Sequence, residues 1–147
     1  MTDNGIPPSG PAQQVRQVLY IEDEPLNVVL MEETFRDRAG WALQVARDGE
    51  SGIAMAREGR PDLVMIDMHL PDMGGLDVLR RLRGAPDTAG LLCVALSADA
   101  MREQVQAALQ AGFDDYWTKP VDLLGLLSGI EGLLSRRGLP GALPPAA

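Results

Sequence analysis

The sequence predicts an α/β protein in which a parallel β-sheet is covered by helices on both faces. Two observations lead to this prediction. Short apolar runs alternate with amphipathic stretches along the chain, which is the pattern of consecutive βα units. Three of the runs are apolar at every position, as expected of strands buried on both sides. The expected architecture is a doubly wound fold of five βα units.

Five runs are the predicted strands. The first, third and fourth are the continuously apolar ones, whereas the second and fifth contain polar residues. In chain order the predicted strands span residues 18–21, 42–46, 63–66, 91–96 and 115–118.

The first two helices have recognisable start signals. Pro25 favours the first turn of a helix, where its missing N–H is not needed, and either Asp23 or Glu24 is placed to cap that turn. Asp48 is placed to cap the second helix. The inward residues are Val28, Met31 and Phe35 in the first helix and Ile53 and Ala56 in the second, which ends at Gly59 and Pro61.

The other three helices are predicted from the spacing of their apolar residues. In the third helix Arg80, Arg81 and Arg83 lie outside, and Gly112 is the expected C-cap of the fourth. The apolar positions are Leu76, Leu79 and Leu82 in the third helix, Val105, Ala108 and Leu109 in the fourth, and Leu123, Leu126, Leu127, Ile130 and Leu134 in the fifth.

Length and composition limit the classes of function. The 147 residues suffice for one domain, expected at 15–137, between tails at 1–14 and 138–147 that are rich in Pro, Gly and Ala and are therefore expected to be disordered. A net charge of −8 and only six aromatic residues (Trp 2, Tyr 2, Phe 2) argue against nucleic acid or an anionic membrane as the partner. No signal peptide or long apolar run is apparent, so we expect a cytoplasmic protein. Cys93 lies in an apolar run, which favours core packing over a reactive thiol.

Polar side chains follow the predicted strands where each strand ends. Glu22 and Asp23 follow the first strand, Asp67 ends the third, Ser97 ends the fourth, and Lys119 ends the fifth. The carboxyl ends of parallel strands meet at one edge of the sheet, where such folds bind ligands. Each residue has a plainer explanation, such as a helix cap for Asp23 or Ser97 and a turn at Lys119, but their coincidence at one edge predicts a site.

The residue types at this edge point to phosphoryl transfer. Neighbouring carboxylates repel one another, and a hard cation such as Mg²⁺ offsets this while keeping waters and accepting phosphate oxygens. Lys119, the single lysine among 13 basic residues, adds a positive charge. Asp67 is then the expected nucleophile toward phosphorus.

The segments around these residues resemble the receiver domain of two-component response regulators. The resemblance covers about residues 15–135. Within it, the chain is similar above all to receivers attached to hybrid sensor kinases and to their single-domain relatives. It implies a flavodoxin-like fold with strand order 2-1-3-4-5. The matching segments are residues 19–27, 61–75, 95–98 and 114–120.

The resemblance also assigns roles to individual positions and implies a cis peptide bond before Pro120. Glu22 departs from the usual Asp, so we expect it to contact the metal through water, and Gly74 replaces a common capping Asp of the third helix. The implied roles are Asp67 as phosphoacceptor, Glu22 and Asp23 as acidic pair, the His69 carbonyl as a further Mg²⁺ ligand, Ser97 as switch hydroxyl, Tyr116 as switch aromatic and Lys119 as phosphate-pairing lysine.

The implied partners are a sensor histidine kinase or histidine phosphotransfer protein and a downstream protein. The implied activity is that of a phosphoacceptor which assists its own phosphotransfer and dephosphorylation, rather than of an enzyme. The fourth helix, fifth strand and fifth helix form the expected output face, and a homodimer through that face is possible. Whether the chain acts alone or as a segment of a hybrid kinase stays open.

Three alternatives are weaker. A dehalogenase-type phosphatase needs a second acid where His69 stands, and a flavin or dinucleotide binder needs a phosphate loop where Glu22 and Asp23 would repel phosphate. A receiver-like module that is never phosphorylated usually lacks the acidic pair or the lysine, and both are present.

Overall fold

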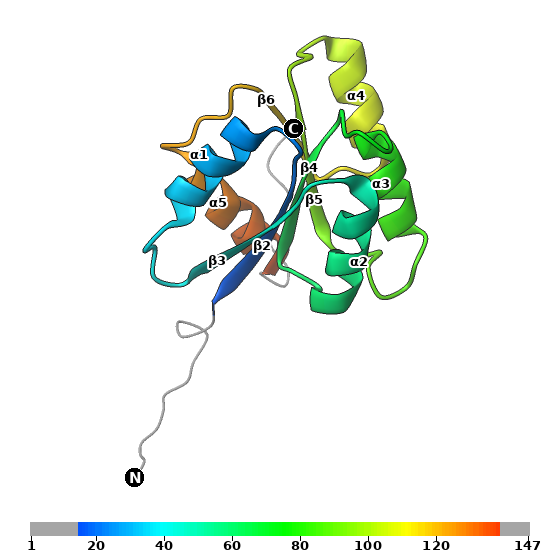
Figure 1. Cartoon of the computed structure of the whole chain (residues 1–147). Coiled ribbons are helices and arrows are strands. Elements are labelled where there is room, and N and C mark those ends of the chain that lie inside the picture. The colour runs from blue at the N-terminus through cyan, green and yellow to red at the C-terminus, as the bar shows by residue number, and fades with distance from the viewer. Residues whose placement is uncertain (1–14, 139–147) are drawn as a thin grey trace.

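A computed structural model describes residues 15–138 and shows a single parallel sheet (Figure 1). The strands lie in the order β3-β2-β4-β5-β6, so the predicted order 2-1-3-4-5 is confirmed. Every neighbouring pair is parallel, which places all carboxyl ends at one edge. The strands are β2 (Arg16–Ile21), β3 (Trp41–Ala46), β4 (Leu63–Asp67), β5 (Leu92–Ser97) and β6 (Asp115–Thr118).

Five helices connect the strands and cover both faces of the sheet. One buried cluster joins the sheet to α2, α3 and α4, and a second joins it to α1 and α5. These two layers are visible on either side of the strands in Figure 1. The helices are α1 (Pro25–Phe35), α2 (Gly49–Gly59), α3 (Gly75–Arg83), α4 (Arg102–Ala111) and α5 (Leu126–Gly138).

Strand β2 shows why the core has two halves. Val18 and Tyr20 pack in the α1–α5 cluster, whereas Leu19 and Ile21 pack in the α2–α3–α4 cluster. Alternate side chains of a strand point to opposite faces, so an apolar run supplies both clusters at once. Cys93 is fully buried in the second of these clusters, as predicted from its apolar run.

Helix boundaries follow local chemistry. Glu24 caps α1 by accepting a hydrogen bond from the Leu26 N–H, which settles the choice between Asp23 and Glu24. Ser97 does not cap α4, because that helix begins at Arg102 with Met101 as its N-cap. The predicted cap Asp48 accepts from the Ser51 N–H at the start of α2.

The fifth helix begins later than its apolar spacing suggests. Leu123 lies outside α5, in the connection from β6, and Leu124 is fully exposed. Asp122 accepts a hydrogen bond from the Gly125 N–H at 3.2 Å, which forms a turn before the helix. The apolar stripe therefore starts at Leu126 rather than at Leu123.

An arginine joins the far ends of several elements. Arg83, the last residue of α3, donates to the carbonyls of Ala89 (2.9 Å), Leu91 (2.6 Å) and Gly112 (2.8 Å) and to the carboxylate of Asp114 (3.1 Å). Gly112 is the C-cap of α4, so this arginine fixes the C-terminal end of that helix. Along α4 the one buried residue is Ala108.

Among residues 15–138 no helix has the length and apolar character needed to cross a membrane. The tails predicted at 1–14 and 138–147 lie outside the described residues, except for Gly138, the last residue of α5.

Candidate functional site

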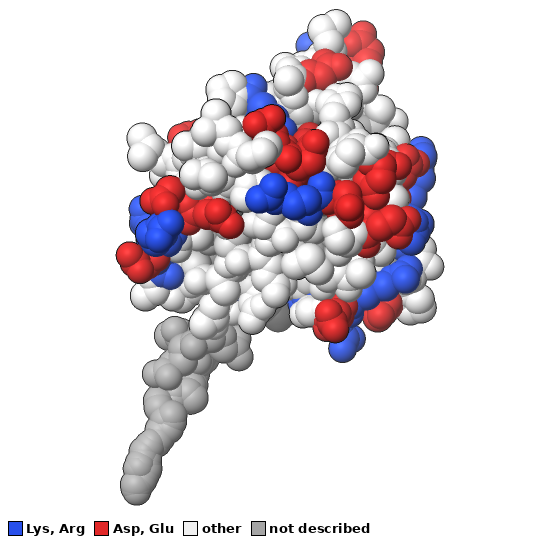
Figure 2. Space-filling view, in the orientation of Figure 1, with Lys and Arg blue, Asp and Glu red and all other residues white. Residues whose placement is uncertain are grey.

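Four elements deliver polar side chains to one edge of the sheet. Glu22 follows β2, Asp67 ends β4, Ser97 ends β5 and Lys119 follows β6. Acidic side chains gather at the upper end of the molecule, where these strands end (Figure 2). The structure thus brings together the residues that the sequence placed at separate strand ends.

Lys119 links the two sides of this site. Its Nζ lies 2.9 Å from Oε1 of Glu22 and 3.3 Å from Oδ1 of Asp67. The lysine N–H donates to the Ser97 carbonyl at 2.8 Å, and the Lys119–Pro120 bond is cis, as predicted. Burial alone would lower the pKa of Lys119, but the hydrogen bond and charge of Glu22 and the charge of Asp67 raise it, so the ammonium stays charged.

Glu22 is fully buried and is held by three donors. Its Oε1 accepts from the hydroxyl of Tyr20 at 3.0 Å as well as from Lys119, and its Oε2 accepts from the Glu24 N–H at 3.1 Å. Burial by itself would raise the pKa of this carboxyl. The hydrogen bonds from Lys119 and the Glu24 N–H outweigh burial and hold the pKa of Glu22 below its usual range, so it is ionised at neutral pH.

Asp67 is buried, with 5% of its surface exposed. Its Oδ1 accepts a hydrogen bond from the His69 N–H at 3.1 Å. Burial, together with the charge of Glu22, raises the pKa of Asp67 despite that bond and Lys119. Because positive charge stabilises the ionised form of a carboxylate, a cation bound beside Asp67 would lower its pKa again.

Three carboxylates form a group suited to a hard cation. Oxygens of Glu22, Asp23 and Asp67 lie within 4.8 Å of one another. Two of these residues are buried and Asp23 is exposed, so the group opens to solvent on one side. Oxygen ligands at such spacing fit a divalent cation that keeps part of its water shell.

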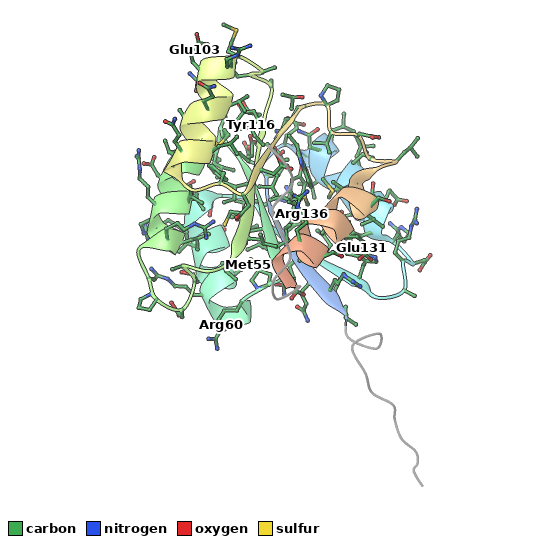
Figure 3. The ribbon with its side chains drawn as sticks, turned by 180° about the vertical axis from the view of Figure 1, so that it is seen from behind. Met55, Arg60, Glu103, Tyr116, Glu131 and Arg136 are labelled. Atoms are coloured by element: carbon green, nitrogen blue, oxygen red, sulfur yellow. The ribbon has the colours of Figure 1, made fainter. Side chains whose placement is uncertain are left out.

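The two predicted switch residues are joined through Asp99. The Asp99 N–H donates to Oγ of Ser97 at 3.1 Å, and the hydroxyl of Tyr116 donates to the Asp99 carbonyl at 2.6 Å. Tyr116 is half-buried and packs beside the α2–α3–α4 cluster, on the side of β6 toward α4 (Figure 3). The carboxylate of Asp99 accepts from the Met101 N–H at the start of α4.

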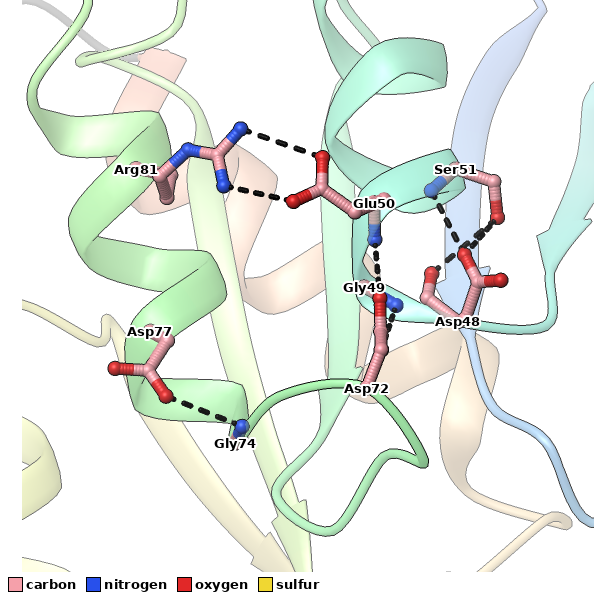
Figure 4. Close-up of polar contacts among 8 residues, drawn as sticks. All are labelled: Asp48, Gly49, Glu50, Ser51, Asp72, Gly74, Asp77 and Arg81. Atoms are coloured by element: carbon pink, nitrogen blue, oxygen red, sulfur yellow. Dashed lines mark hydrogen bonds and ion pairs between the residues drawn. The ribbon is translucent and has the colours of Figure 1, made fainter.

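The loop between β4 and α3, which follows Asp67, is anchored on α2. Asp72 accepts hydrogen bonds from the N–H groups of Gly49 (2.8 Å) and Glu50 (2.9 Å), so it caps α2 from another element (Figure 4). Burial would raise the pKa of Asp72, but these backbone donors lower it. Arg81 adds an ion pair to Glu50 at 3.0 Å.

Helix α3 begins without a side-chain cap at Gly74, as its sequence predicts. Asp77 compensates in part, because its carboxylate accepts from the Gly74 N–H at 3.2 Å (Figure 4). At Gly75 an added Cβ would lie 2.8 Å from the Asp67 carbonyl oxygen and from Cα of Met68, so glycine is needed for this close approach.

Sequence reasoning missed two contributors, Tyr20 and Asp72. Tyr20 lies in an apolar run and resembles a core residue, although its position two residues before Glu22 puts both on one face of the strand. Asp72 offered no signal, because its partners on α2 are 23 and 22 residues away. His69 is exposed, and its backbone N–H is tied to Asp67.

Comparison with known proteins identifies relatives along most of the chain. The regulatory protein TcrX of Mycobacterium tuberculosis is 42% identical over 123 residues, which are 83% of this chain and 51% of TcrX. A 14.6 kDa protein of Leptolyngbya boryana is 34% identical over 78% of this chain and 86% of its own length. The chain spans about half the length of TcrX and of other curated regulators that it matches.

Solved structures with the same fold include two of particular interest. A putative response regulator from Chloroflexus aurantiacus has a TM-score of 0.76 at 26% identity and covers 84% of this chain and 100% of its own. The receiver domain of the sensor histidine kinase PA1611 from Pseudomonas aeruginosa, solved with a magnesium ion in its active site cleft, has a TM-score of 0.74 at 26% identity over 82% of this chain and 98% of its own. Residues 18–131 match the family described as response regulator receiver domain, and with this match, the fold and the acidic site together, the chain belongs to that family.

Proposed function

We propose that this domain accepts a phosphoryl group on Asp67 from a phosphohistidine, with Mg²⁺ as cofactor. The observation that carries the proposal is the contact of Lys119 with both Glu22 and Asp67, beside the three-carboxylate group. A module that only binds a partner has no need of this arrangement of acids and lysine.

The described residues have separable tasks in this reaction. An oxygen of Asp67 forms a bond to phosphorus while the phosphorus–nitrogen bond of the donor breaks, and its electron pair stays on the imidazole nitrogen. Lys119 can pair with the charge of the incoming group, and Ser97, buried at the end of β5, can donate its hydroxyl to it.

The metal would be held by carboxylates of Asp23 and Asp67 and by the backbone carbonyl of His69, with Glu22 acting through water. When bound, Mg²⁺ supplies positive charge that offsets the charge on the phosphoryl oxygens. The burial of Glu22 and Asp67 favours this assignment, because two neighbouring buried carboxylates repel each other and a bound cation offsets that repulsion.

The proposed partners are a histidine kinase or histidine phosphotransfer protein as donor and a protein as target. The target face consists of α4, β6 and α5, where Tyr116 is linked to Ser97 through Asp99. A groove of about 620 Å³ between β6 and α5, lined in part by Trp117, Gly129 and Arg136, adds to this face. A second copy of the domain could use the same surface. The proposal concerns the receiver domain, whose acidic composition does not favour nucleic acid.

Labelling with acetyl phosphate tests the proposal. Wild type should form a base-labile adduct in Mg²⁺ and none in EDTA, and Asp67→Asn should abolish it. Asp62→Asn is a matched control, because Asp62 lies before β4, at the other edge of the sheet, and accepts from the Gln17 N–H. An adduct of full strength in Asp67→Asn would place the phosphoacceptor elsewhere.

A further inference from the structure

The hydroxyl of Tyr20, a residue of β2, contacts the acidic site from the side of the sheet that α1 and α5 cover. Tyr20 is 2% exposed and packs among residues of α1 and α5. Its hydroxyl donates to Oε1 of Glu22 at 3.0 Å. Because side chains two apart on a strand share a face, the tyrosine and the glutamate are aligned by the strand itself.

The hydrogen bonds of Glu22 leave it little freedom. A carboxylate offers about four lone-pair sites, two on each oxygen. Tyr20 and Lys119 fill both sites of Oε1, and the Glu24 N–H fills one site of Oε2. The carboxylate of Asp67 also lies beside Glu22, so the orientation that these three donors impose decides how Glu22 meets a cation or its bound water.

The length of Glu22 matters for this contact. Aspartate at the same position would be shorter by one methylene, which reduces its reach by up to about 1.5 Å. A 3.0 Å contact would then lengthen beyond the range of a hydrogen bond. Tyrosine at position 20 and glutamate at position 22 therefore depend on each other.

We propose that Tyr20 is a positioning residue of the metal site, acting through Glu22. Its hydroxyl holds Oε1 beside Lys119 and so fixes the orientation of the Glu22 carboxylate within the group formed with Asp23 and Asp67. This inference rests on the assignment of that group as the Mg²⁺ site. Partners that orient a metal-binding carboxylate typically affect metal affinity by about ten- to a hundredfold.

A double-mutant cycle on Mg²⁺ binding tests the inference. Calorimetric titration of MgCl₂ into the metal-free domain is compared for wild type, Tyr20→Phe, Glu22→Asp and the double variant. Tyr20→Phe should weaken Mg²⁺ binding about tenfold in the wild-type background. In the Glu22→Asp background the same change should alter the Kd less than twofold, because the shorter carboxylate does not reach the hydroxyl.

Thermal unfolding in EDTA provides a second readout. Tyr20→Phe should lower the melting temperature when residue 22 is Glu and leave it unchanged when residue 22 is Asp. Equal Mg²⁺ affinity of wild type and Tyr20→Phe, tighter binding by Tyr20→Phe, or the same effect of the change in both backgrounds would overturn the inference. Failure of the proposed function looks different, since wild type would then form no base-labile adduct on Asp67 in acetyl phosphate, whatever its Mg²⁺ affinity.

Discussion

Lys119 donates to Oε1 of Glu22 across 2.9 Å, although 97 positions separate the two residues in the chain. The contact is shorter than the 3.3 Å between Lys119 and Asp67. The ammonium thus lies nearer to Glu22, the acidic residue after β2, than to the proposed phosphoacceptor Asp67. It partly neutralises a buried pair of carboxylates that would otherwise repel each other.

Replacing Lys119 with Met should destabilise the metal-free protein by about 1 to 3 kcal/mol, because Glu22 then loses a charged donor while it stays buried. Urea unfolding in EDTA measures the change. Arg36→Met is the control, since Arg36 pairs with Glu33 on the exposed surface and its loss should leave stability nearly unchanged. Equal effects of the two changes would mean that the buried contact contributes no more than a surface ion pair.

The Asp67→Asn variant should be more stable than wild type in EDTA at neutral pH. Burial raises the pKa of Asp67, so ionised Asp67 costs stability above its folded-state pKa. As the pH falls toward the ordinary Asp value near 4, wild type takes up the proton and the difference should shrink. Unfolding curves between about pH 4 and 8 test this. Mg²⁺ should stabilise wild type only, and a variant less stable than wild type at pH 7 would contradict the prediction.

The contributions of Asp48 and Asp72, the two residues that cap α2, can be separated by mutation. Asp48→Ala and Asp72→Ala should each cost about 1 kcal/mol, because each removes acceptors from N–H groups of the first turn. Only Asp72 also ties the loop that carries His69, so only Asp72→Ala should weaken Mg²⁺ binding, by a few-fold. Calorimetry gives the affinity and urea unfolding the stability. Equal Mg²⁺ affinity in the two variants would show that Asp72 serves α2 alone.

Two glycines should respond to alanine in opposite ways. Gly75→Ala places a Cβ 2.8 Å from backbone atoms of Asp67 and Met68 and should destabilise the fold strongly. Gly132 is exposed in α5 with nothing within 4 Å of the added atom, so Gly132→Ala should stabilise by up to about 1 kcal/mol. Thermal unfolding of both variants decides the matter, and similar melting temperatures would contradict the close approach at Gly75.

Activation should reach the face of α4, β6 and α5. Beryllofluoride with Mg²⁺, followed by NMR, should shift amide signals around Asp67 and also those of Asp99 and Tyr116, which are linked by a hydrogen bond. Asp67→Asn serves as the control and should show neither set of shifts. Changes confined to the surroundings of Asp67 would mean that this face does not carry the signal.

The sequence was sufficient for the sheet because three of its strands are continuous apolar runs and because polar residues stand at the carboxyl ends of the strands. It placed Asp67, Ser97 and Lys119 at one edge before any distance was known. It was less informative where side-chain reach decides. Whether Glu22 meets Tyr20 depends on one methylene, and the start of α5 depends on a turn at Asp122 rather than on apolar spacing.

Arg83, at the end of α3, holds the C-terminal end of α4, so that the helix can rotate about this end. Arg83 secures Gly112 at one end of the helix, Ala108 is the one buried residue along it, and at the other end Met101 is joined to Tyr116 only through the hydrogen bonds of Asp99. Ten residues of helix are about 15 Å long, so a rotation of α4 by about 10° around its C-terminal end would displace its first residue by about 2.6 Å. We therefore expect the largest displacement of α4 near Glu103, which lies in the first turn of the helix and at its upper end in Figure 3.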